Sequence, residues 1–207
     1  MFYRSSVLPK GTRTPHTIGF SIVELMVSIA IVMLVLSIVV TGQQSFNGAV
    51  LLRSQAFEIA LAIREIQLGA VSAVSDGSGD FRAAQGIYFN ITSPGTNQEY
   101  KLFRDADGNR FYGPGEDIGF SGLLDRRFEI RKIGFNGDSM SNELAIVFQR
   151  PNFDAMFATD DTNAGSPFDG QVVITIGLRG GTGTVCAEDI REIEVRSTGQ
   201  ISVIECP

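Results

Sequence analysis

The chain has 207 residues, of which 43% are hydrophobic and 19% charged, a composition that fits a folded protein and excludes a disordered one. Its net charge of −6 is unevenly distributed, because residues 1–19 carry three basic side chains and no acidic one, which leaves 14 basic against 23 acidic residues in the remainder. An acidic body has no general attraction for nucleic acid or for anionic lipid. The single histidine, His16, lies in the basic leader, so most histidine-dependent catalysis is excluded from the body.

An uninterrupted apolar segment follows the leader, at residues 20–40, with the sequence FSIVELMVSIAIVMLVLSIVV. As a helix these residues would be about 30 Å long, the thickness of a bilayer core. Glu24 is the only formal charge in the segment. The segment therefore predicts a membrane-spanning helix, and Gly42 just beyond it would permit a bend.

Apolar residues recur at helical spacing between residues 45 and 70. Two sets fall on neighbouring turns: Phe46, Val50, Phe57 and Leu61, with Arg64; and Leu52, Ile59, Ile63 and Ile66. This periodicity, with no proline, predicts an amphipathic continuation of the first helix. We expect one long helix from about residue 20 to 70, apolar all round in its first half and with a single apolar face in its second.

Short β-rich segments separated by Gly, Pro, Asn and Asp occupy the rest of the chain. They are residues 86–92, 99–103, 126–135, 143–149, 171–178, 191–196 and 200–205. Such a succession predicts a mainly antiparallel sheet with hairpins, and residues 150–170 read as a long loop. The expected fold class is α+β, with the long N-terminal helix packed on an antiparallel β-sheet head.

The basic leader and apolar segment admit three interpretations. A secretory signal peptide has a shorter apolar core, of about 7–15 residues, followed by a small-residue cleavage site. A plain membrane anchor fits the length but gives no reason for Glu24, since a carboxylate at the membrane centre costs a few kcal/mol. The third interpretation is a precursor whose leader is removed just before the apolar segment.

The residues Gly19-Phe20-Ser21-Ile22-Val23-Glu24 resemble the prepilin cleavage and methylation motif of type IV pilin-like proteins. In that motif a glycine precedes the cut, phenylalanine becomes the new N-terminus, and glutamate is the fifth mature residue. The resemblance implies cleavage after Gly19 by a membrane prepilin peptidase, N-methylation of Phe20, and an assembly role for Glu24. It also implies the pilin fold, other pilin subunits as partners, and an inner-membrane location with an extracytoplasmic head.

The physical logic of the motif is independent of the resemblance. Cleavage after Gly19 creates an ammonium on Phe20, four residues from Glu24. The two charges can neutralise each other along one helix or between neighbouring subunits, where dry surroundings strengthen the attraction. One departure is that Thr41-Gly42 stands where many major pilins have a proline.

A looser resemblance concerns the kind of pilin. Residues 56–67, 143–151 and 191–203 are similar to the helix, a strand and the final hairpin of minor pilins and pseudopilins of the FimT/GspH type. That family implies a low-abundance subunit of a pilus, competence or secretion filament. Some relatives bind DNA through basic residues near the C-terminus, but here acidic residues outnumber Arg179, Arg191 and Arg196 in that region, so DNA binding is not expected.

These features predict four parts of the chain. They are a leader at 1–19, a transmembrane or filament-core helix at 20–42, its amphipathic continuation at 43–75, and an antiparallel β head at 76–207. The alternative to a filament subunit is a single-pass, membrane-anchored surface adhesin or binding domain that does not polymerise.

The segment from Asp105 to Glu116 matches an EF-hand calcium loop. The ligands would be Asp105, Asp107, Asn109, the backbone carbonyl of Phe111, and Glu116, because Ca²⁺ takes hard oxygen ligands at these spacings. Arg110 is a mismatch, since the motif has glycine there for a sharp turn, and flanking helices are not expected. The alternative is an acidic, glycine-rich turn between two strands.

Cys186 and Cys206 lie 20 positions apart and flank the predicted final hairpin. In an oxidising compartment a disulfide between them would stabilise the fold by about 3 kcal/mol in the chain-entropy model. Pilins often fasten their C-terminal region in this way, which agrees with the resemblance. Two free buried thiols are the alternative.

No catalytic motif is found in the sequence. The glycine-rich residues 179–184 lack the dinucleotide-binding spacing, and Ser121 has no histidine to activate it. We therefore expect a structural or binding protein and no enzyme.

Overall fold

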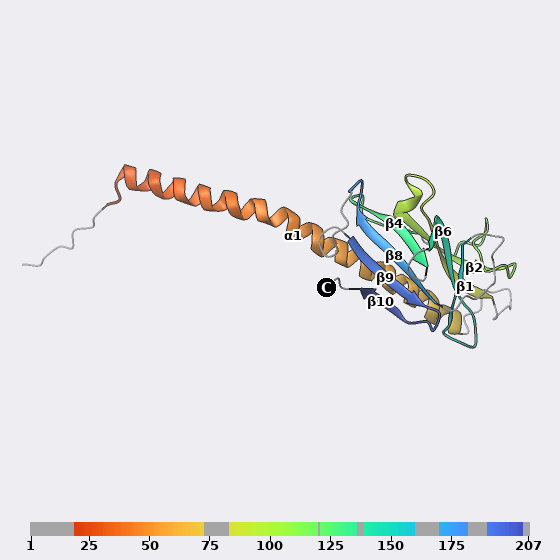
Figure 1. The fold of residues 1–207 in the computed structure, drawn as a ribbon. Helices are drawn as coiled ribbons and strands as arrows, with labels where there is room; N and C mark the ends of the chain where they lie inside the picture. Colours follow the sequence, from red (N-terminus) through yellow and green to blue (C-terminus); the bar gives the residue numbers. More distant parts are fainter. Residues whose placement is uncertain are drawn as a thin grey trace, which may run out of the picture. The chain divides into compact units, whose positions relative to one another are not determined.

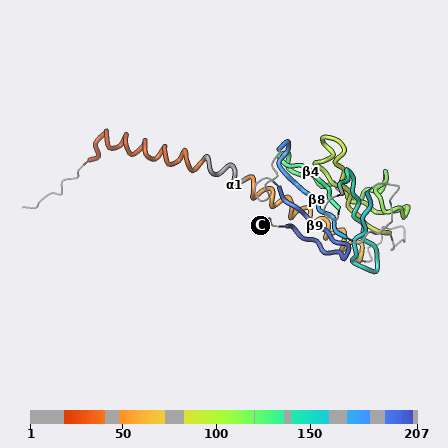
Figure 2. Tube along the Cα trace, viewed as in Figure 1, coloured from red at the N-terminus to blue at the C-terminus, as the bar shows by residue number. Residues whose placement is uncertain are grey.

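The computed structural model describes residues 19–72, 83–119, 121–135, 139–159, 170–181 and 190–204. The chain divides after Gln44 into an N-terminal unit and a head. Figures 1 and 2 show the path of the chain within each unit.

A single long helix, α1 (Ile22–Val71), contributes to both units. In the N-terminal unit its segment Ile22–Val40 has 19 residues, a mean hydropathy of 2.8 and no buried residue. Within the described part of the chain, this is the segment long and apolar enough to cross a membrane, a property that N-terminal signal sequences share. The prediction of an N-terminal helix of membrane-spanning length is confirmed.

The part of α1 in the head packs one face against strands. The buried residues recur every three or four positions, so they project from the same side of the helix. They are Leu52, Ala56, Ile59, Ala60, Ile63, Ile66, Gln67 and Ala70.

Among the described residues of the head, ten strands form two antiparallel five-stranded sheets. The first has the order β3-β2-β1-β6-β7, with β1 (Ala84–Asn90), β2 (Glu99–Asp105), β3 (Gly122–Leu123), β6 (Glu143–Phe148) and β7 (Ala155–Ala158). The second has the order β10-β9-β8-β4-β5, with β4 (Phe128–Phe135), β5 (Ser139–Ser141), β8 (Gln171–Leu178), β9 (Ile190–Arg196) and β10 (Ile201–Ile204). A short 3₁₀ helix, η1 (Thr96–Gln98), precedes β2.

One apolar core joins the helix to both sheets. It includes Ile59 and Ile63 of α1, Ile146 of β6, Ile174 of β8 and Ile193 of β9, all at most 1% exposed. Figure 1 shows β9 and β10 running beside the last part of α1, where Arg64 donates to the carbonyl of Ile201 at 3.3 Å. The α+β class is therefore confirmed, with an apolar helix and antiparallel sheets.

The structure corrects four predictions about the head. The strands form two sheets, where the sequence suggested one. Residues 155–158 lie in the predicted loop but form β7, because they pair with β6 in register, Ala158 opposite Ala145. The short strands β3 and β5 were also missed, since two or three residues carry no readable alternation.

The fourth correction concerns the number of apolar faces on α1 in the head. The set Leu52, Ile59, Ile63 and Ile66 is buried. The other set is not: Val50, Phe57 and Leu61 are 52%, 48% and 66% exposed. The helix therefore has two apolar faces, and the described part of the head covers only one of them.

Candidate functional site

The predicted cleavage site lies at the beginning of α1. Gly19, Phe20 and Ser21 are not helical, and Phe20 is 82% exposed. Helical hydrogen bonding begins where the amide of Leu25 donates to the carbonyl of Ser21 at 3.1 Å. Glu24 is the acidic residue of the first turn, a position where the helix dipole favours a negative charge.

The second candidate site is the loop between β2 and β3. Asp105, Asp107 and Glu116 each place one carboxylate oxygen so that the three oxygens lie within 4.8 Å of one another. Three of the predicted ligands, at the first, third and twelfth loop positions, are therefore brought together.

Glu116 reaches the start of the loop because the chain returns along β2. The amide of Arg104 donates to the carbonyl of Glu116 at 2.9 Å, and the amide of Ile118 donates to the carbonyl of Leu102 at 2.8 Å. This antiparallel pairing fixes the position of Glu116 beside the last residue of β2, Asp105.

Backbone amides bond to all three carboxylates, and that of Asp107 accepts from the amide of Asn109 at 3.0 Å. Asp105 accepts from the amide of Gly108 at 2.8 Å and from that of Arg110 at 3.1 Å. Glu116 accepts from the amide of Ala106 at 2.8 Å and from that of Gly113 at 2.7 Å. The loop is thus a set of tight turns closed by its own carboxylates. This also agrees with the alternative to a calcium site, an acidic, glycine-rich turn between two strands.

Arg110, the residue that departs from the EF-hand pattern, has the left-handed backbone conformation that glycine has at this position of the motif. Arg110 has φ 63° and is the non-glycine residue with positive φ among those described. The predicted ligand Asn109 is bonded within the loop: its Oδ1 accepts from the amide of Phe111 at 2.7 Å, and its Nδ2 donates to Asp107 at 3.0 Å.

Electrostatics at the loop disfavour a charged Asp105. Its side chain is nearly buried, with 5% of the residue exposed. Burial raises the pKa of Asp105, the negative charges of Glu116 and Asp107 raise it further, and the two backbone hydrogen bonds oppose the shift. A bound cation would offset the first two effects.

A small aromatic core holds the loop on the first sheet, a feature the sequence analysis did not identify. The ring of Tyr88 on β1 stacks on Tyr112 at 5.0 Å and meets the edge of Phe111 at 5.4 Å. Lys101 donates to the hydroxyl of Tyr112 at 3.2 Å. The adjacent aromatic residues Phe111 and Tyr112, within the acidic loop, are the sequence signal that could have predicted this anchor.

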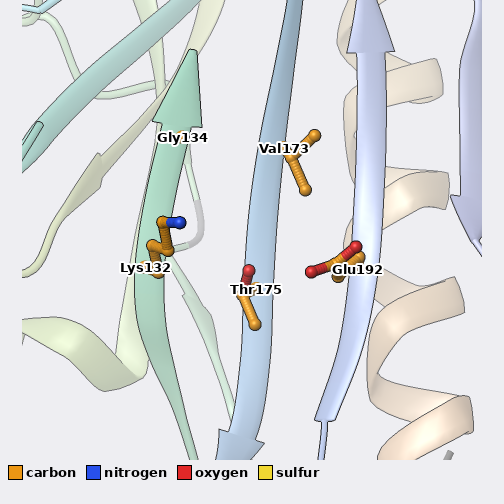
Figure 3. A pocket seen from close by; sticks show the side chains of 5 residues that line it. All are labelled: Lys132, Gly134, Val173, Thr175 and Glu192. Carbon is orange, nitrogen blue, oxygen red and sulfur yellow. The ribbon is translucent and has the colours of Figure 1, made fainter. Parts of the chain in front are cut away.

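A shallow groove of about 210 Å³ lies on the second sheet, lined by Lys132, Gly134, Val173, Thr175 and Glu192. Lys132 pairs with Thr175, and Thr175 with Glu192, in adjacent strands. Figure 3 shows the Lys132 and Glu192 side chains extending towards the middle strand, β8. The groove offers an amine, a hydroxyl and a carboxylate in one row.

The remaining predicted site residues lie outside the described residues. They are Cys186 and Cys206, with the leader up to residue 18, so the disulfide stays a prediction. Comparison with known proteins gives no guide, because no protein-family model, no curated protein and no solved structure matches the chain.

Proposed function

We propose that the chain is the precursor of a type IV pilin-like filament subunit, cleaved after Gly19 and assembled through α1. The observation that carries this proposal is Glu24, a carboxylate in the first turn of an otherwise apolar helix segment. A further support is the non-helical backbone from Gly19 to Ser21, since proteases cut exposed, non-helical segments.

The chemistry of Glu24 gives the proposal its mechanism. Removal of the leader creates an ammonium on Phe20, and Glu24 is four residues away on the helix. In an assembled subunit the amine of one chain pairs with Glu24 of a neighbour, since two charges attract strongly where water is excluded. This pairing offsets the cost of the carboxylate in an apolar environment and sets the axial register of the incoming subunit.

Within this class we propose a minor pilin or pseudopilin. The three segments that resemble that family are parts of α1, β6 and the β9–β10 hairpin. Their side chains pack in one core, for example Ile59, Ile146 and Ile193. On β9 two arginines balance two glutamates, with Arg196 bonded to Glu194 at 2.5 Å, so the described residues of this strand form no basic surface for nucleic-acid binding.

The competing function is a membrane-anchored surface domain that does not polymerise. It would use the same apolar helix but gives Glu24 no role and leaves the leader attached. The two functions therefore differ in the mature N-terminus.

The deciding experiment is mass spectrometry of the N-terminal peptide from membranes of the producing cells. The filament proposal expects N-methylated Phe20 as the first residue. A chain that begins at Met1 would remove the proposal. A chain in which Gly19→Leu blocks cleavage is the control, because it should keep the leader and remain in the membrane without entering filaments.

We also propose that the head binds Ca²⁺ at Asp105, Asp107 and Glu116. The supporting observation is the approach of their carboxylate oxygens to within 4.8 Å, with Arg110 in the left-handed conformation usual for the glycine of such loops. Oxygen ligands in this arrangement suit a weak extracellular site, with Kd of about 10⁻⁴–10⁻³ M.

Thermal unfolding of the full chain in detergent tests the calcium site. Millimolar Ca²⁺ should raise the Tm reversibly, and a chelator should remove the rise. Asp105→Ala should abolish the response, whereas Asp154→Asn, which removes an exposed carboxylate elsewhere on the head, should keep it. An unchanged Tm in the unmodified chain would show that the loop is only a turn.

A further inference from the structure

The exposed apolar face of α1 in the head forms a narrow stripe. Its members are Val50, Phe57, Leu61 and Leu68, which are 52%, 48%, 66% and 61% exposed. With about 100° of rotation per residue, their side chains leave the helix within about 20° of one line. The buried residues Leu52 and Ile59 lie on the opposite side, so nothing in the described head covers the stripe.

The two sides of the stripe carry opposite charges. Arg53 and Arg64 lie about 40–60° to one side of it, and Glu58 and Glu65 lie about 60–80° to the other. All four residues are exposed. The guanidinium of Arg53 lies 5.6 Å from the ring centre of Phe57, and Arg64 is held on its side by its hydrogen bond to the carbonyl of Ile201.

This separation of charge distinguishes two ways of pairing the stripe with itself. When two helices lie parallel about a two-fold axis, the basic side of each faces the acidic side of the other. When they lie antiparallel, basic faces basic and acidic faces acidic. Opposite charges across a helix pair stabilise it and like charges destabilise it. The stripe therefore favours a parallel partner with the same charge pattern.

We infer that a second copy of this chain packs on the stripe of Val50, Phe57, Leu61 and Leu68, with the two helices parallel. This inference rests on the proposed function, which places the two copies together in a membrane or a filament. In heptad terms Ser54, Leu61 and Leu68 occupy one seam position and Val50, Phe57 and Arg64 the other. The hydrogen bond of Arg64 to the carbonyl of Ile201 draws its guanidinium to the side of the seam. Arg53 of one copy then faces Glu58 of the other, five positions further along.

Charge complementarity favours a second copy over a lipid surface. A helix that lies on a membrane usually has basic residues on the polar sides of its apolar face. Here one whole side is acidic, at Glu58 and Glu65, and would be repelled by anionic lipid. A copy of the same chain satisfies both sides at once.

Disulfide cross-linking in membranes of cells that produce the full chain tests this pairing. Single variants Val50→Cys and Leu68→Cys are oxidised and run on non-reducing gels. Parallel packing brings each new cysteine next to its own copy, so both variants should give dimers several-fold above background. Antiparallel packing would instead cross-link only cells that co-express the two variants, and that result would overturn the inference.

Two controls define the background. The unmodified chain reports any contribution of Cys186 and Cys206, and Leu123→Cys places a cysteine at another exposed leucine of the head, 69% exposed against 61% for Leu68. Dimer yields equal to these controls would mean that lipid or a different protein covers the stripe, and the inference would fail.

Charge reversal adds a test that folding defects cannot imitate. Arg53→Glu in the Val50→Cys chain should lower the dimer yield, because two acidic sides then face each other at that level. Adding Glu58→Arg should restore it. Failure of the double variant to recover would contradict the proposed facing of Arg53 and Glu58.

The N-terminal mass of the same samples separates this inference from the proposed function. Cross-linking in a chain that retains Met1 would support the pairing and remove the filament subunit. N-methylated Phe20 without cross-linking would remove the pairing and leave the filament subunit in place.

Discussion

The backbone amide of Arg110 donates to Oδ2 of Asp105 at 3.1 Å, and it does so from a left-handed backbone conformation, with φ 63°. Arg110 occupies the loop position where EF-hand sequences have glycine. The turn around the carboxylates therefore places an arginine in a conformation that favours glycine, and the backbone of Arg110 is strained.

We expect Arg110→Gly to stabilise the head by about 1 kcal/mol, because a side chain in the left-handed region costs about 1–2 kcal/mol and glycine has no such cost. The same change should strengthen calcium binding. Denaturant unfolding of the full chain in detergent, followed by circular dichroism, measures the first effect.

Arg126→Gly is the matched control for this change. Arg126 is exposed in the turn before β4 and is not among the described residues with positive φ. There glycine only adds freedom to the unfolded chain, so the variant should be slightly less stable than the unmodified protein. If both variants shift stability in the same direction, the conformation of Arg110 is not a source of strain.

Two aspartates of the head should titrate on opposite sides of the ordinary value. Burial raises the pKa of Asp105 above 3.8. Hydrogen bonds and attraction from Arg127, whose Nε lies 2.9 Å from the carboxylate, lower the pKa of Asp125 below 3.8. Carbon-13 NMR of the two carboxyl groups measures both.

The raised pKa of Asp105 also fixes the direction of a pH effect on stability. The folded state holds the proton more tightly than the unfolded state, so Asp105 favours folding below pH 3.8, and this contribution is lost as the pH rises through the higher folded pKa. Calcium should lower the apparent pKa of Asp105 and leave Asp125 unchanged. An equal response of both aspartates would indicate general screening by the salt.

The sequence predicted the elements of this fold better than their arrangement. Seven of the strands and the long helix have a regular apolar periodicity that can be read locally. The short strands β3, β5 and β7 depend on pairing with strands already in place, as Ala155–Ala158 does with β6. Periodicity also could not tell which apolar face of α1 the sheets would cover, because Val50 and Phe57 are as regularly spaced as Leu52 and Ile59.

The candidate sites show the same division. The spacing of Asp105, Asp107 and Glu116 predicted their approach, because a single loop holds all three. The left-handed conformation of Arg110 runs against its residue type, and the role of Gln67 depends on residues 86 and 132 positions away. Such contacts leave no local pattern in the sequence.

Gln67 links the helix to two loops of the head. Its Nε2 donates to the carbonyl of Phe153 at 3.0 Å and to that of Gly199 at 2.9 Å, and the residue is 8% exposed. Gln67→Ala should reduce the free energy of unfolding by about 1–3 kcal/mol, because it removes two hydrogen bonds donated by a nearly buried side chain.

Gln200→Ala is the control for Gln67, since Gln200 is exposed in the neighbouring turn and its loss should change stability by less than about 0.5 kcal/mol. Hydrogen exchange at the β9–β10 turn provides a local readout of the Gln67 contacts. Unchanged protection there in Gln67→Ala would contradict the proposed link between helix and hairpin.

The proposed role of Glu24 in assembly can be separated from its effect on membrane insertion. Glu24→Gln keeps the size of the side chain and removes the charge. Insertion should be unaffected or improved, because a carboxylate in the membrane costs about 2.5–3.5 kcal/mol. Incorporation into filaments should be lost, since the amine of Phe20 on the neighbouring subunit would have no carboxylate to pair with. Alkaline extraction of membranes measures insertion, and immunoblotting of sheared filaments measures incorporation.

Asp154→Asn is the control, because it removes a charge on the head and should leave both insertion and incorporation unchanged. Normal incorporation of Glu24→Gln would show that the carboxylate is not an assembly contact.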